Sequence, residues 1–203
     1  MSAQLHEDLF LTHALAHVAR RAMRPWGLHG VAHWWRVRHN GLLVAQHTRA
    51  DTRVVRLFAI IHDSFREDDR RDPLHGERAA AWIARVRRDE MHADDSICAT
   101  TARVVRMLDD VAFDQLRRAC ELHTSTIKTD DVTIDTCFAA DRLDLARVGF
   151  RPDPLLIPVD SALLSCEFID DAMRRTREGL AWVEPEEFRE TWGIAVDSSA
   201  RES

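Results

Sequence analysis

The chain has 203 residues, 45% of them hydrophobic and 31% charged, and its net charge of −6 is spread along the sequence. This length and apolar content fit one domain with a buried core. Because no basic stripe is interleaved with aromatic residues, nucleic acid is excluded as the main partner. No stretch reaches membrane-spanning length, and polar residues interrupt the first ten positions, so we expect neither a membrane partner nor a signal peptide.

The cysteines are scattered through apolar segments with no Cys-x-x-Cys spacing. This pattern predicts reduced thiols buried in the core rather than disulfides or a metal-thiolate site. Together with the absence of a signal peptide, it indicates a cytoplasmic protein. The four positions are Cys98, Cys120, Cys137 and Cys166.

Apolar residues recur at helical spacing along most of the chain, and no alternating stretch is long enough to predict a strand. We expect an amphipathic helix that ends before Pro25 and a second helix from His29 to Ala45. Asp51 is expected to cap a third helix over 52–61.

The second half of the chain continues this all-α pattern. Asp72 and Pro73 predict the start of a fourth helix, with the aspartate as cap and the proline in the first turn. A glycine at the end of the seventh helix, Gly149, is expected to stop it. The later helices are expected over 94–108, 114–123, 134–148 and 159–179.

The apolar run 57–61 ends in His62 and Asp63, and the residues that follow are too polar to continue a buried helix. Adjacent residues point about 100° apart on a helix, but at a helix end the backbone can turn both side chains toward one point. Imidazole nitrogen with carboxylate oxygen suits a divalent transition metal. Because a His-Asp pair alone is usually ordinary surface, a metal site requires further ligands.

Three helix-borne residues supply candidates for those ligands, namely His33, His123 and Asp141. Asp141 lies among apolar neighbours, where a carboxylate is costly to desolvate unless a metal or a cation meets it. It is therefore either a metal ligand or the ion-pair partner of a nearby arginine.

The order His33, His62-Asp63, Asp141 resembles the HD-domain superfamily of metal-dependent phosphohydrolases. The resemblance extends over residues 29–149 and includes the segments 33–37, 75–80 and 140–145. It implies an all-α HD-domain fold in which these four residues ligate divalent manganese, iron, cobalt, nickel or zinc. The metal would lower the pKa of a bound water and hold a phosphate oxygen.

Some members of the superfamily hold a second metal through additional histidines between the His-Asp pair and the last aspartate. His75 and His123 are the candidates here, although His75 follows His62 more closely than we expect for that arrangement. Each could instead pack, cap a helix or, for His75, contact the substrate. His29 is a candidate for the rim of the site.

The residues after the His-Asp pair are candidates for catalysis. Guanosine tetraphosphate hydrolases of this superfamily carry a Glu-Asp step there that helps to activate water, and Glu67-Asp68 is similar in place. The alternative is a solvated charged loop. Arg66 is expected to neutralise a substrate phosphate, and Lys128, the only lysine, is a second candidate.

The resemblance implies a phosphohydrolase that acts on a small phosphorylated compound, with a nucleotide as the default substrate. The alternatives are a dinuclear-iron oxygenase, which needs both His75 and His123 as ligands, and a non-catalytic, metal-stabilised binding module. Many HD proteins are dimers, so a homodimer is possible, although no surface pattern argues for it. The expected parts are an N-terminal helix packing on the core (1–28), the metal-binding core (29–150), a helical extension (151–184) and a polar tail (185–203).

Overall fold

The computed structural model of the protein describes residues 27–90 and 99–178. The described residues form seven α-helices and no strand, which confirms the prediction of a single-domain all-α fold. None of these helices is both long and apolar enough to cross a membrane. The helices are α2 (Val31–Thr48), α3 (Thr52–Ile61), α4 (His75–Arg87), α5 (Ala99–Met107), α6 (Asp110–Leu122), α7 (Val132–Arg142) and α8 (Cys166–Glu178).

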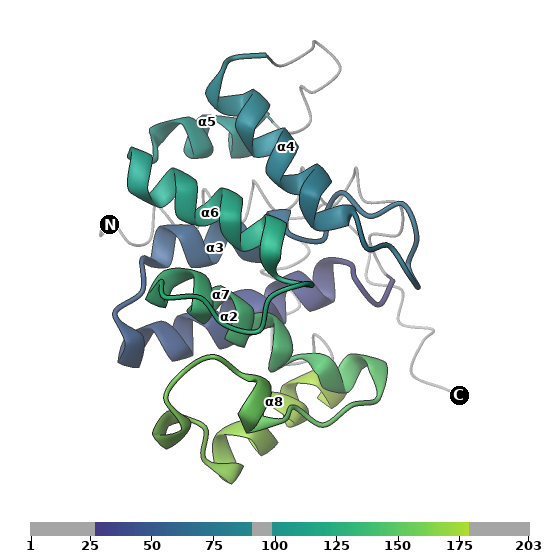
Figure 1. Cartoon of the computed structure of the whole chain (residues 1–203). Coiled ribbons are helices and arrows are strands. Elements are labelled where there is room, and N and C mark those ends of the chain that lie inside the picture. Colours follow the sequence, from purple (N-terminus) through teal and green to yellow (C-terminus); the bar gives the residue numbers. More distant parts are fainter. Residues whose placement is uncertain (1–26, 91–98, 179–203) are drawn as a thin grey trace, which may run out of the picture.

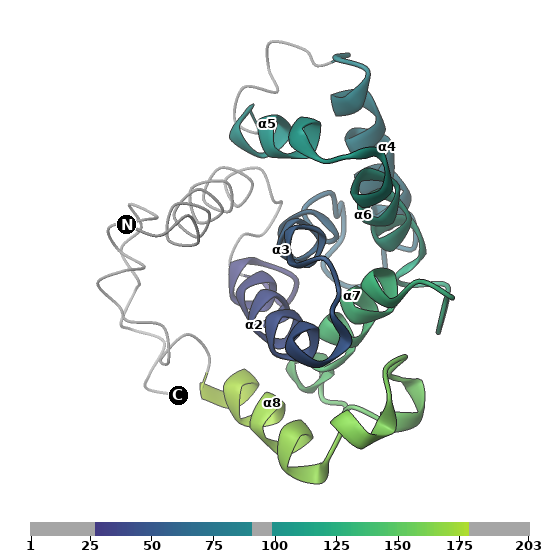
Figure 2. The ribbon, with the colours of Figure 1, turned by 90° about the vertical axis from the view of Figure 1, so that its left-hand side faces the viewer.

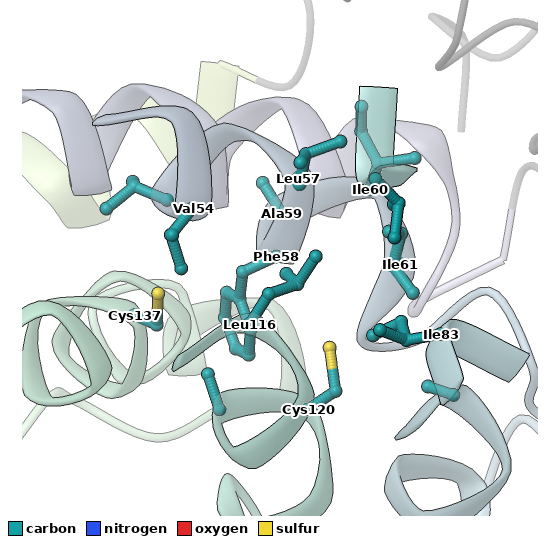
Figure 3. Close-up of a cluster of buried hydrophobic side chains, with 14 of the residues drawn as sticks. Val54, Leu57, Phe58, Ala59, Ile60, Ile61, Ile83, Leu116, Cys120 and Cys137 are labelled. Carbon is teal, nitrogen blue, oxygen red and sulfur yellow. The ribbon is translucent and has the colours of Figure 1, made fainter. Parts of the chain in front are cut away.

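Helix α3 is the centre of the fold, with α2, α6 and α7 packed around it (Figures 1 and 2). All of its residues from Val54 to Ile61 are buried. Figure 3 shows Phe58 of α3 close to Leu116 of α6 in this core. Full burial of one such side chain contributes about 1.5–3 kcal/mol, so α3 is held on all sides and its C-terminal end has a fixed position.

Aspartate caps define where several helices begin. Asp51 accepts a hydrogen bond from the Arg53 N–H at 2.9 Å, which confirms the predicted cap of α3. Asp109 caps α6 in the same way, so this helix begins at Asp110 and the prediction of a start at Asp114 was wrong. Asp109 and Asp114 each precede an apolar run, and a cap at Asp109 allows the longer helix.

The fourth helix begins at His75, three residues after the predicted cap. Asp72 instead accepts hydrogen bonds from the Glu67 N–H and the Arg78 guanidinium. These contacts close the loop between α3 and α4 upon itself, and they leave His75 in the first turn of α4.

The chain after α7 is less regular than its apolar spacing predicted. Helix α7 ends at Arg142, and a separate 3-10 turn, η2 (Leu145–Val148), follows it. Gly149 has a φ of 88° and stops η2 rather than α7. Two further 3-10 turns precede α8, which begins only at Cys166; they are η3 (Pro154–Leu156) and η4 (Ser161–Leu163).

Two of the predicted core cysteines, Cys120 and Cys137, are buried and free, as expected. Cys166 is exposed at the start of α8, so the prediction that it is buried was wrong. Cys98, the expected N-terminal helix, the start of the fifth helix and the polar tail lie outside the described residues.

Helix α2 crosses α3 and α7 at Gly41, where the side chains of Val55 and Ala140 leave no room for a further side chain. A Cβ atom at this position would lie 2.5 Å from Cγ1 of Val55 and 3.1 Å from Cβ of Ala140. Since Gly41 lies two turns from His33 and Ala140 adjoins Asp141, this close approach also sets the distance between two predicted metal ligands.

Substitution of Gly41 by Ala should therefore destabilise the fold. Overpacking a close-packed core costs about 1–3 kcal/mol, partly offset by about 1 kcal/mol from the better helix propensity of Ala. Urea unfolding should show a lowered midpoint, and adding Val55→Ala should recover part of the loss, because it removes the clashing methyl group. A Gly41→Ala variant as stable as the native chain would contradict this packing.

Candidate metal centre

All six predicted metal ligands come together at the C-terminal end of α3. They form two groups, within each of which the donor atoms lie within 4.8 Å of one another, and each group could hold a metal ion. We call them the His33 group (His33, His62, Asp141) and the His75 group (Asp63, His75, His123).

The positions of these histidines in their helices explain why they converge. His62 and His123 are the C-cap residues of α3 and α6. Carbonyl oxygens in the last turn of a helix can accept a further hydrogen bond, and each ring turns back onto one of them; the Phe58 carbonyl also accepts the main-chain N–H of His62 at 3.0 Å. Nδ1 of His62 lies 2.9 Å from the Phe58 carbonyl, and Nδ1 of His123 lies 2.7 Å from that of Cys120.

His33 and His75 are held in the same manner from the other side. Nδ1 of His33 lies 2.7 Å from a carboxylate oxygen of Asp144, and Nδ1 of His75 contacts the Asp72 carbonyl. Because carbonyl and ionised carboxylate oxygens only accept, Nδ1 must carry the proton in all four histidines. In the neutral form of each ring, Nε2 is then a bare acceptor, as in a metal-ligating histidine held by an outer partner.

These Nε2 atoms face each other in pairs. They are 3.1 Å apart between His33 and His62, and 2.9 Å apart between His75 and His123. Two lone pairs at this distance repel each other unless a cation lies between them. Two nitrogens bound at right angles to one ion, each about 2.1 Å from it, would be about 3.0 Å apart, so the observed spacing suits a shared metal.

Asp141 supplies the third donor of the His33 group. Its Oδ1 lies 3.3 Å from Nε2 of His33 and is buried without a hydrogen-bond partner in residues 27–90 and 99–178. A buried acceptor of this kind is costly to leave unsatisfied. An ion shared with the two histidines would satisfy it, which supports the fit of a metal to this group.

Asp63 joins the two groups through its two oxygens. Oδ2 lies 3.4 Å from Nε2 of His33 and 3.6 Å from Nε2 of His62, whereas Oδ1 lies 3.0 Å from Nε2 of His75. The carboxylate therefore faces both groups at once. The short sequence spacing between His62 and His75 is compatible with this arrangement, because the loop between α3 and α4 folds back on itself.

Burial and neighbouring charge set the protonation of the His33 group. Burial and Arg147 oppose a charged His33, but the carboxylates of Asp141, Asp144 and Asp63 outweigh them and raise the pKa of His33 to about 9. Burial lowers the pKa of His62 to about 3. Without a metal, the pair therefore shares one proton at neutral pH, and that proton takes the place of a cation.

Metal binding to the His33 group should consequently compete with this proton. Since the pKa of His33 lies above neutral pH, an ion must displace one proton, and its apparent affinity should rise about tenfold per pH unit from about pH 7 and level off above about pH 9. Calorimetric titration with Zn²⁺ in buffers of different ionisation enthalpy would measure the release of about one proton per ion. Affinity that is independent of pH over this range would contradict the proposed protonation.

Asp144 is a buried partner of the site to which sequence reasoning gave no role. Besides His33, it accepts hydrogen bonds from Nε and Nη2 of Arg36 at 2.7 and 3.0 Å, and from the Thr176 hydroxyl at 2.7 Å. Thr176 belongs to α8, so the C-terminal extension is tied to a candidate metal ligand. The signal in the sequence was the position of Asp144 one helical turn after Asp141.

Two predicted accessory residues adjoin the groups. His29 precedes α2, which begins only at Val31, and its Nδ1 lies 2.9 Å from Oδ2 of Asp63. Nη1 of Arg66 lies 3.2 Å from Oδ1 of Asp63. The same atom is 3.2 and 3.3 Å from the two ring nitrogens of His75, so it lies over the ring and leaves the in-plane lone pair accessible.

The structure places Glu67 and Asp68 facing solvent. The Glu67 side chain is 76% exposed and its nearest charged partner is Arg78 at 3.7 Å. The Asp68 carboxylate accepts a hydrogen bond from the Arg70 N–H. This position favours the alternative of a solvated charged loop, and a catalytic role for either residue stays a prediction.

Lys128, the other predicted phosphate contact, lies away from the metal groups. It lines a cavity of about 640 Å³ together with His47 and Thr48, at the C-terminal end of α2. His33 is 15 residues before Thr48 on this helix, or roughly 22 Å along its axis at 1.5 Å per residue. Lys128 therefore does not adjoin the candidate metal centre.

Comparison of the chain with protein-family models, curated proteins and solved structures gives no match. Its function must therefore be inferred from the chemistry of the site itself. That site offers two adjoining sets of nitrogen and oxygen donors that share one carboxylate.

Proposed function

We propose that this protein is a metal-dependent phosphohydrolase of the HD-domain type that binds two divalent transition-metal ions, one at each group. Its substrate would be a small phosphorylated compound, with a nucleotide as the default. The observation that carries the proposal is the double pair of facing Nε2 atoms around the shared Asp63 carboxylate.

The donor set favours particular metals. Four imidazole nitrogens and two carboxylates, divided between two adjoining groups, suit manganese, iron, cobalt, nickel or zinc better than calcium, which prefers oxygen alone. The carboxylate of Asp63, oriented toward both groups, is suited to hold two ions close together, as in two-metal hydrolases.

The charge of the site favours an anionic substrate. The guanidinium of Arg66 lies 3.2 Å from Asp63, and that of Arg147 lies 3.7 Å from Asp141. The two guanidinium groups thus neutralise the charge of the two carboxylates before any ion binds. Bound metal ions would then give the site an excess of positive charge that attracts an anion. A phosphoryl group carries the negative charge and the oxygen atoms that such a site would bind.

When bound, the ions would supply an activated water and polarise a phosphoryl oxygen. The chain's own residues would position the reaction. Asp144 holds His33 in the tautomer that exposes Nε2, and the main-chain carbonyls of α3 and α6 hold His62 and His123. Arg66, whose side chain keeps 11% exposure beside Asp63, would bind a phosphoryl oxygen.

One observation favours a second candidate function. A dinuclear-iron oxygenase requires His75 and His123 both to bind metal, and both lie with Asp63 in one group. The excess positive charge supports hydrolysis of a phosphate ester instead. Two irons per chain after anaerobic purification, with oxygen consumption and no phosphate release, would favour the oxygenase, whereas full metal occupancy with neither reaction would favour a binding module.

The metal content of variants should separate the two groups. Elemental analysis of native protein purified without chelator should find two ions per chain. His75→Ala and His123→Ala should each retain one ion, and Asp63→Asn should lose most of both because it serves both groups. His47→Ala, at the far end of α2, is the matched control and should keep two. Unchanged metal content in Asp63→Asn would contradict the shared carboxylate.

Phosphate release from a panel of nucleotides and other phosphomonoesters and pyrophosphates tests the reaction itself. Native protein with Mn²⁺ should release phosphate, chelator should abolish the release, and Asp63→Asn should lower turnover by at least about 100-fold, since removing a catalytic ligand costs several kcal/mol. Glu67→Gln should stay within about threefold of native turnover because this carboxylate is exposed. The proposal would be excluded if native protein with Mn²⁺ bound at both groups released no phosphate from any of these substrates.

A further inference from the structure

Arg147 lies in η2, the 3-10 turn that follows Asp144. Its side chain is buried beside Asp141 of the His33 group, with 8% exposure. Its Nη2 is 3.7 Å from Oδ1 of Asp141 and 3.4 Å from Nδ1 of His29. No motif in the sequence pointed to this arginine, and in the proposed function its charge balances that of Asp141.

The guanidinium has few partners for a buried cation. Nη1 donates to the main-chain carbonyl of Asp144 at 3.1 Å, but Nε is buried and has no hydrogen-bond partner in the part of the chain that the structure describes. Nη2 lies too far from Asp141 for a hydrogen bond.

His29 does not satisfy Nη2 either. Its Nδ1 is 2.9 Å from Oδ2 of Asp63, an acceptor, so the proton of that nitrogen is directed to Asp63. An Nδ1 that donates to Asp63 cannot also accept a hydrogen bond from Arg147. Nε and Nη2 form one edge of the guanidinium, and among the described residues this whole edge is left with unused donors beside the metal groups.

A neighbouring arginine shows what this edge is suited to bind. Nε and Nη2 of Arg36 donate to the two oxygens of Asp144 at 2.7 and 3.0 Å, a bidentate contact with a planar oxyanion. Arg147 presents the same pair of donors, but the nearest carboxylate oxygen among the described residues, Oδ1 of Asp141, lies 3.7 Å from Nη2 and beyond hydrogen-bond distance. Buried donors left unused are costly, and an anion that occupies this edge would satisfy them.

The edge of the two groups is not fully buried. Asp141, His29 and Arg66 keep 17%, 14% and 11% of their side-chain surface exposed. Arg147 lies beside the His33 group, whereas Arg66 lies over the His75 group. An oxyanion placed between the two groups would therefore meet one guanidinium on each side.

We propose that the Nε and Nη2 edge of Arg147 binds two oxygens of the substrate phosphoryl group beside the His33 group. The proposal rests on the proposed function and assigns the substrate class more narrowly, as compounds with a terminal, doubly charged phosphate. Such a group can offer two oxygens to the fork of Arg147 and still reach the metal ions and Arg66.

Calorimetric titration of inorganic phosphate into the Mn²⁺-loaded full chain would test this role. Arg147→Gln should weaken phosphate binding by about 10-fold to 100-fold, the loss expected for a charge-assisted hydrogen-bond pair. The phosphate affinity of Arg147→Lys should lie between those of Arg147→Gln and the native protein, because lysine keeps the charge but lacks the two parallel donors of the guanidinium. Arg151→Gln is the matched control, because Arg151 is 53% exposed and pairs with Asp170, and it should bind phosphate like the native chain.

The Mn²⁺ affinity of the same variants separates substrate binding from a structural role. Removing a cation beside Asp141 should leave Mn²⁺ affinity unchanged or raise it, with no fall in Tm. Native phosphate affinity in Arg147→Gln, or a joint loss of phosphate, Mn²⁺ and Tm, would overturn the role of Arg147 while phosphoester hydrolysis by the native chain continued. A loaded native chain that neither binds phosphate nor hydrolyses any phosphoester would overturn both proposals.

Discussion

The structure depends on holding bare histidine nitrogens against one another in a dry interior. His33 and His62 are fully buried, and their Nε2 atoms are 3.1 Å apart. Each ring is fixed by a partner at Nδ1, so neither can rotate away from the other. Such a cluster is stable only when a proton or a metal ion lies within it. The raised pKa of His33 indicates that a proton takes this place when no metal is bound.

The fold supplies the rigidity that this arrangement requires. Helix α3 is enclosed by α2, α6 and α7, so its C-terminal end cannot move toward solvent (Figure 2). Asp144 then connects His33 with Arg36 of α2 and Thr176 of α8. Core packing thus places the ligands roughly, and hydrogen bonds to their Nδ1 atoms set their final orientation.

Sequence patterns predicted much of this site because its ligands interrupt buried apolar helices. His62 and Asp63 follow an apolar run, and the structure brings both into the two groups, with the Asp51 cap and α3 as expected. Asp144 received no role because its partner His33 is 111 residues away in the chain. Arg147 received none because no sequence pattern shows that its guanidinium lies buried beside Asp141. The start of α6 was missed because Asp109 and Asp114 were both suitable caps, and that of α4 was missed because Asp72 bonds within the preceding loop instead of capping the helix.

The most direct test of the account is a crystal structure of the Mn²⁺-loaded protein with anomalous diffraction. Two anomalous peaks per chain are expected, one within the His33 group and one within the His75 group, with the Asp63 carboxylate contacting both. A single peak, or peaks remote from these histidines, would contradict the central claim that one carboxylate at the end of α3 organises a two-metal centre.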